Sequence, residues 1–182
     1  MPQRAAVAVV TGQLAVVEAW LDAVDRADTG AATALCAPDL EIVGPRGSVR
    51  GREVLGPWLA RAGFRARPLR WFCGAGGEVV VEQDATWADP ATGAERGRAV
   101  VAARFLVTDG VIARVQRHDD GLPTALAAAG LRESDEVTAR RCPAAAGTGQ
   151  PCARTCWVTS SATRSGASSG MKWGRPSSTS SR

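Results

Sequence analysis

Residues 37–53, APDLEIVGPRGSVRGRE, decide the fold of this chain. The apolar residues between Leu40 and Val43 predict a short strand, and the Gly-Pro and Arg-Gly pairs after them indicate a turn. Residues 52–62 then carry apolar side chains at helical spacing, with Pro57 inside the first turns, so we expect a helix that starts late or is kinked. The stretch therefore predicts a strand, a Gly/Pro turn and a helix in immediate succession.

Two further helices are predicted before this stretch. In residues 13–26 the apolar side chains fall on one helical stripe and the charged ones mostly lie off it, the stripe being Leu14, Val17, Trp20, Leu21 and Val24. Asp28 is placed to cap a second, shorter helix over residues 31–36, which Pro38 ends.

The chain from residue 69 to residue 130 reads as a meander of strands followed by a short helix. Alternating side chains and turn residues predict strands over 69–73, 78–88, 97–108 and 111–118. An Asp-Gly pair forms the hairpin turn before the last of them. The helix is alanine-rich and ends at Gly130. Helices first and an antiparallel sheet afterwards indicate an α+β domain.

This order of elements resembles the nuclear transport factor 2-like superfamily, and within it the SnoaL-like domain, which is distantly similar to ketosteroid isomerases and polyketide cyclases. The motifs are an aromatic residue on the first helix, the Ala-Pro-Asp-Leu-Glu strand entry and the Arg-Gly-Arg-Glu helix start. Over residues 13–130 the resemblance implies a cone-shaped roll, with three N-terminal helices packed on a strongly bent mixed or antiparallel sheet. It also implies a conical pocket and a homodimer that pairs through sheet faces.

The remaining segments are expected to be outside this domain. Residues 1–12 are predicted to form a flexible N-terminal extension, and residues 131–182 a linker and a disordered Ser/Arg-rich tail that lacks apolar periodicity. Two origins of the tail stay open, an out-of-frame or recently acquired extension and a basic arm for an acidic partner.

The resemblance places three isomerase positions on residues that cannot transfer a proton. The aspartate base would stand at Gly44, the tyrosine of the oxyanion hole at Trp20, and the partner acid near Ala103. An indole N–H donates a hydrogen bond but is no acid. The steroid isomerase mechanism is therefore not expected, and the catalytic sets of the cyclases cannot be matched residue by residue.

Three other residues are candidates for acid/base catalysis. His118 is the only histidine and precedes two aspartates; its alternative is a strand-end side chain in solvent. Asp84 is the best placed carboxylate if its face of the 78–88 strand lines the cone, and otherwise belongs to a solvated or interface face. Glu41 lies inside the short first strand, either near the pocket mouth or simply exposed.

Five residues are candidates for contacting a ligand. Four tryptophans fall on predicted helices or strands, where they form either core or an aromatic wall for a flat apolar molecule: Trp20, Trp58, Trp71 and Trp87. Gln83 shares an otherwise apolar strand face with Trp87. If that face lines the cone, Gln83 binds the ligand by hydrogen bonds; if it faces a second protomer, Gln83 is an interface contact.

The positive charge of the chain lies in its tail. The net charge is +4, but residues 142–182 hold five basic residues and no acidic one, which leaves 17 basic against 18 acidic residues in the body. Nucleic-acid binding is therefore expected, if at all, only through the tail.

The cysteines and the N-terminal segment argue against a metal-binding, secreted or membrane-spanning protein. Cys36 and Cys73 sit in apolar segments as small core residues, and the tail cysteines match no zinc spacing, so neither a metal nor a cofactor is expected. Reduced thiols are typical of a cytoplasmic protein. The apolar run 5–10 lacks a clean cleavage site and leads into a helix, and no run reaches the ~20 residues of a membrane span.

Two functions follow from this sequence. The first is a domain that binds a small, mostly apolar ligand in a conical pocket. The alternative is an enzyme of the SnoaL-like kind that performs acid/base cyclisation, isomerisation or hydrolysis on a polyketide-like or terpenoid-like substrate. The enzyme needs a carboxylate or histidine inside the cone.

Overall fold

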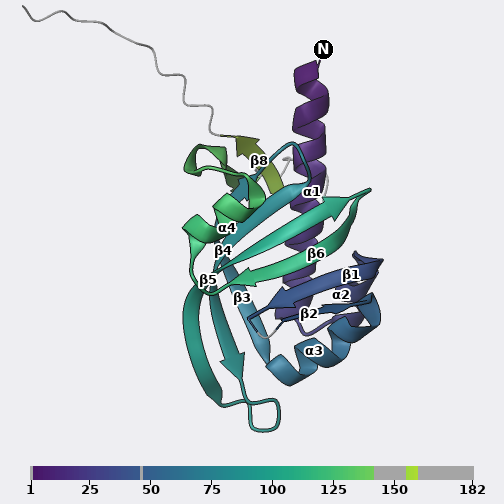
Figure 1. The fold of residues 1–182 in the computed structure, drawn as a ribbon, viewed down its shortest axis with the longest axis vertical. Helices are drawn as coiled ribbons and strands as arrows, with labels where there is room; N and C mark the ends of the chain where they lie inside the picture. Colours follow the sequence, from purple (N-terminus) through teal and green to yellow (C-terminus); the bar gives the residue numbers. More distant parts are fainter. Residues whose placement is uncertain (1, 46, 142–154, 160–182) are drawn as a thin grey trace, which may run out of the picture.

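A computed structural model describes residues 2–45, 47–141 and 155–159 of the chain (Figure 1). Helices at the N-terminus pack on one strongly bent sheet, so the α+β cone expected from the sequence is confirmed. The sheet has eight described strands in the order β2-β1-β6-β5-β4-β3-β7-β8. It is mixed, because β1 pairs with β6 in parallel and the other pairs are antiparallel.

The helices begin and end where local chemistry requires. Helix α1 spans Pro2–Asp25 and α2 spans Thr29–Ala34, where the Asp28 carboxylate accepts a hydrogen bond from the N–H of Ala31 (2.9 Å). A 3₁₀ turn, η1 (Arg52–Val54), precedes α3 (Leu55–Ala62). Pro57 thus lies in the first turn of α3, where its missing N–H costs no helical hydrogen bond.

Five of the described strands contain the predicted ones, and three of these, β1, β3 and β5, extend beyond the predicted ranges. The bounds are as follows: β1 Cys36–Gly44, β2 Gly47–Arg50, β3 Phe64–Cys73, β4 Glu78–Ala88, β5 Glu95–Thr108, β6 Val111–His118, β7 Glu136–Arg141 and β8 Thr155–Thr159. Between β5 and β6, Asp109 and Gly110 both have positive φ (52° and 77°), as a two-residue hairpin turn with right-handed strand twist requires. Helix α4, Leu122–Ala129, ends at Gly130, which adopts the left-handed conformation.

The register of the sheet separates two faces. The inner face carries Val79, Val81, Gln83, Ala85 and Trp87 of β4 and packs on α1 in the main core, together with Trp20 and Phe105. The outer face carries the alternate residues, and α4 covers part of it through a second, smaller cluster: Phe72, Val80, Ala102, Leu122, Ala125 and Leu126. The face that contains Gln83 is therefore the one turned toward the helices.

Two segments outside the predicted domain, 2–12 and 136–141, also have regular secondary structure. Helix α1 starts at Pro2, so residues 2–12 are helical; alanine-rich chain favours helix, and proline suits its first turn. Residues 136–141 form β7 instead of a linker, because Val137 is buried opposite Trp71 in β3.

Residues 155–159 of the expected tail form β8 against β7. The prediction of disorder for residues 142–154 and 160–182 lies outside the described residues. None of the helices in the described part combines the length and apolar character that crossing a bilayer demands.

Candidate ligand pocket

A pocket of about 890 Å³ opens on the inner face of the sheet, between the β1–β2 hairpin, α3 and the ends of β4, β5 and β6. Its volume lies within the ~300–1,000 Å³ range of small-molecule sites. The lining is mostly apolar: Ile42, Val43, Gly44, Pro45, Gly47, Ser48, Val49, Trp58, Arg61, Ala62, Trp87, Ala99, Val100, Val101, Val115, Arg117 and Asp119. The cavity therefore has room for one compact organic molecule.

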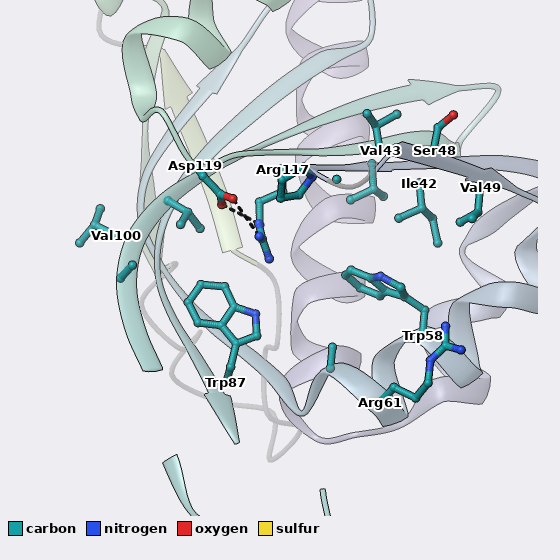
Figure 2. A pocket seen from close by; sticks show the side chains of 17 residues that line it. Ile42, Val43, Ser48, Val49, Trp58, Arg61, Trp87, Val100, Arg117 and Asp119 are labelled. Carbon is teal, nitrogen blue, oxygen red and sulfur yellow. Dashed lines mark hydrogen bonds and ion pairs between the residues drawn. The ribbon is translucent and has the colours of Figure 1, made fainter. Parts of the chain in front are cut away.

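Two half-buried indoles flank the cavity. Trp58 comes from α3 and Trp87 from the end of β4, and Figure 2 shows them on opposite sides of the space. Phe64, at the start of β3, contacts both, with ring centroids 6.3 Å from Trp58 and 5.9 Å from Trp87. A buried phenyl ring that is not part of the pocket lining thus contacts both indoles.

Arg117 and Asp119 supply charge beside the indoles. Arg117 lies on the inner face of β6, and its Nη2 donates to Oδ2 of Asp119 (2.9 Å). Its Nε lies 2.6 Å from Oδ1, a close ion pair, although the angle at Nε is outside hydrogen-bond range. The guanidinium carbon stands 5.2 Å from the centre of the Trp87 ring, which is cation–π distance.

Only some of the residues that the sequence predicts as ligand contacts line the pocket. Trp58 and Trp87 line the pocket. Trp20 and Trp71 are buried in the main core, Trp20 edge-on to Phe105 with ring centroids 5.5 Å apart. Gln83 is also buried, on the inner face directly across the ladder from Val101, a residue of the pocket wall. Thus two of the four tryptophans lie at the cavity and two lie behind it.

The predicted catalytic residues lie elsewhere and are not brought together. Glu41 is not among the residues that line the cavity, although its neighbour Ile42 is, and it accepts a hydrogen bond from Nε of Arg114 (2.7 Å). Hydrogen bonds from Arg114, followed by the charges of Arg114 and Arg50, lower the pKa of the Glu41 carboxyl. A carboxylate whose pKa is lowered by hydrogen bonds and charges of neighbouring arginines is a poor proton acceptor.

Asp84 and His118 lie on the outer face. Asp84 accepts from Nε of Arg98 (2.8 Å), and this hydrogen bond is the main cause of the lowered pKa of its carboxyl. His118 is buried opposite Ala102, with Nδ1 3.7 Å from an oxygen of Asp120 and no hydrogen-bond partner for Nε2 among the described residues. None of the three predicted residues lines the pocket.

Sequence reasoning missed Arg117 and Asp119. The available signal was the alternation of β6, in which Val115 and Arg117 share one face. The two positions that the resemblance assigns to acids carry no ionisable side chain. Gly44 lines the pocket, and Ala103 is buried on the inner face between Val81 and Arg117. The pocket thus holds its ionisable groups at different places from those the resemblance indicates.

The described residues provide no grouping of three His, Cys, Asp or Glu side chains that would hold a metal ion. Cys36 and Cys73 are buried, and burial raises their pKa to about 11 and about 12. Both are therefore protonated thiols at neutral pH, suited to packing and not to ligation or nucleophilic attack.

A helix-backed, bent mixed sheet with an apolar pocket on its inner face defines the class of α+β cones like nuclear transport factor 2. The chain belongs to the SnoaL-like domain family, whose sequence pattern matches residues 17–115, more than half of its length. No curated protein matches it in sequence.

Solved structures share the fold at low sequence identity. An NTF2-like protein of unknown function from Cytophaga hutchinsonii is 16% identical, with TM-score 0.52 over 58% of this chain and 88% of that one. Bal32a, from a soil-derived mobile gene cassette, is 20% identical, with TM-score 0.52 over 60% and 90%. A Mycobacterium tuberculosis protein in complex with estradiol-17β-hemisuccinate is 15% identical, with TM-score 0.52 over 59% and 92%. These likenesses show the fold.

Proposed function

We propose that this SnoaL-like domain binds one small, flat and mostly apolar molecule between Trp58 and Trp87. The observation that carries the proposal is the pair of half-buried indoles across a cavity of about 890 Å³ with a largely apolar lining. Indole faces offer large contact areas to a planar ligand and lose little side-chain entropy on binding.

The pocket wall explains why the occupant is apolar. Ile42, Val101 and Val115 face the cavity from three strands, and such surface is favourable to cover at roughly 25 cal/mol per Å² removed from water. A ligand that replaces water against this wall gains the free energy of burying that apolar surface. A strongly hydrated molecule would lose its own hydration without compensating hydrogen bonds over most of the surface.

The experiment is a titration with N-phenyl-1-naphthylamine, a neutral, flat and apolar fluorescent probe. Saturable binding with a micromolar dissociation constant is expected. Trp58→Ala and Trp87→Ala should each weaken it by about 3- to 10-fold, because an aromatic contact contributes about 0.5–1.5 kcal/mol. Leu69→Ala, at an exposed site outside the pocket, is the matched control and should change nothing. Absence of saturable binding, or binding that ignores both tryptophan substitutions, would refute the proposal.

An acid/base enzyme is the second candidate, and the observation that favours it is Asp119, the one carboxylate among the residues that line the pocket. Its charge is engaged by Arg117. If the chain is such an enzyme, Asp119→Asn should abolish turnover of a polyketide-like or terpenoid-like substrate while probe binding persists.

A further inference from the structure

Arg117 is an unusual residue for its position. It lies on the inner face of β6, in line with Ala103 and Val81 across the ladder, and its side chain is only 26% exposed. A charged group beside an apolar cavity is costly unless it is paired and hydrogen-bonded. The contacts of its guanidinium therefore show how much of that requirement is met within the chain.

Asp119 engages only one edge of the guanidinium. Arginine has five N–H donors in a planar fork, and the ion pair with Asp119 uses Nε and Nη2. Figure 2 shows the end of the guanidinium away from Asp119 pointing into the space between the two indoles. Among the described residues no second acceptor contacts the group. One end of the fork is thus left for a molecule in the cavity.

The free end is also held in place. The Trp87 ring lies against the guanidinium and Asp119 fixes its opposite edge, so the side chain is oriented before any ligand arrives. Pre-orientation matters because less side-chain entropy is then lost on binding. This arrangement suits a planar group with two acceptor oxygens, which can take two parallel hydrogen bonds from arginine.

The residues that line the pocket carry a net positive charge. The ionisable residues of its lining are Arg61, Arg117 and Asp119, so the lining carries one net positive charge. The Asp119 side chain is 46% exposed, and solvent screens its charge more than that of the less exposed Arg117. A monoanion complements this balance, whereas a cation would meet the guanidinium.

We propose that the ligand is a flat apolar acid whose anionic oxygen group binds the free end of Arg117 while its apolar body lies between Trp58 and Trp87. The inference rests on the proposed function and names the chemical class of its ligand. A neutral carbonyl would also accept from Arg117, but the net charge of the lining and the greater strength of charge-assisted hydrogen bonds favour the anion.

The test compares two fluorescent probes with one aromatic skeleton. 1-Anilinonaphthalene-8-sulfonate carries an anionic oxygen group that N-phenyl-1-naphthylamine lacks. The full chain should bind the anionic probe about tenfold more tightly than the neutral one. Arg117→Met should weaken the anionic probe by about tenfold and leave the neutral probe within about twofold. Arg26→Met removes an exposed arginine that lies outside the lining and should change both affinities by less than twofold.

Two further variants keep the result interpretable. Arg117→Met combined with Asp119→Asn removes the carboxylate that the single variant leaves without its partner, and should show the same selective loss. Arg117→Lys keeps the charge but not the planar fork and should bind the anionic probe with intermediate affinity.

The outcomes separate the two ideas. If neither probe saturates, the proposed function fails. If both bind with equal affinity in the full chain, or if Arg117→Met weakens both equally in a folded protein, the pocket binds apolar molecules and the anion assignment is overturned.

Discussion

Replacing Gln83 by methionine should stabilise the protein. Gln83 is 2% exposed, and its Oε1 has no hydrogen-bond partner among the described residues. A buried, unpaired amide oxygen costs about 1–3 kcal/mol in desolvation. Methionine has the same chain length and no strongly polar atom, and a volume-conserving exchange costs less than about 1.5 kcal/mol. The free energy of unfolding of Gln83→Met should therefore rise by about 1 kcal/mol.

A second buried glutamine supplies the matched control. Gln13 lies on α1, and in the amide orientation that satisfies both ends its Nε2 donates to the Gly74 carbonyl (3.2 Å) and its Oε1 accepts from the Gly77 N–H (3.3 Å). Gln13→Met removes both of these hydrogen bonds, so it should lower the free energy of unfolding by about 1–3 kcal/mol. The same exchange should thus have opposite signs at the two sites.

Urea denaturation followed by circular dichroism measures both variants, with ΔG obtained by linear extrapolation at unchanged m. If Gln83→Met destabilises the protein as Gln13→Met does, its oxygen has a partner such as a buried water and the reasoning is refuted. Probe titration on the same variant adds a functional readout. Because Val101 opposite Gln83 lines the pocket, a stabilised variant that loses probe affinity would identify Gln83 as a ligand contact, which is one of the two alternatives that the sequence leaves open.

Three further expectations concern backbone, charge and assembly. Gly63→Ala should destabilise the protein by more than about 1 kcal/mol, because φ is 53° and an added Cβ would lie 2.1 Å from a carbonyl oxygen of β4. Gly93→Ala is the control, since φ is 72° but the space is open, and its loss of stability should be smaller. Thermal melts compare the two variants. Arg98 lowers the pKa of Asp84, so the Asp84 carboxylate contributes to stability above the usual pKa of 3.8, and this contribution is lost as the pH falls through the lowered pKa. In thermal melts recorded at several pH values, Asp84→Asn should therefore lose less stability at acid pH than the wild type does. Sedimentation at tens of micromolar should show the homodimer that the resemblance implies; a wild-type monomer would contradict it.

The sequence predicts the sheet best where two signals coincide. Strands β4 and β6 have the predicted bounds because turn residues close their ends, and the side chains of β4 also alternate along its length. Strand β7 was missed because Val137 is the one buried side chain among its described residues 136–138, and its pairing partner in β3 is far away in the chain. So short a stretch leaves no periodic pattern to read.

The site was predictable only in part, for a different reason. Tryptophan is a good candidate for a pocket wall wherever it falls, so Trp58 and Trp87 could be named without knowing their neighbours. Charged residues need their partners. Glu41 pairs with Arg114, 73 positions later, and no local pattern shows that this contact neutralises the carboxylate. Arg117 at the end of a strand reads as solvated until the register turns it inward.

The position of the charge also bears on the choice between binding and catalysis. Gly44 and Ala103 leave the inner face without acids at the two places where the resemblance puts them, and the charge of the pocket resides in Arg61, Arg117 and Asp119. A guanidinium keeps its proton at neutral pH, so it binds and orients an anion but does not exchange protons with it. Asp119 is held by that same guanidinium. A cavity built in this way favours recognition of an acid over transfer of a proton, because its strongest polar interaction is made with a group whose charge does not change.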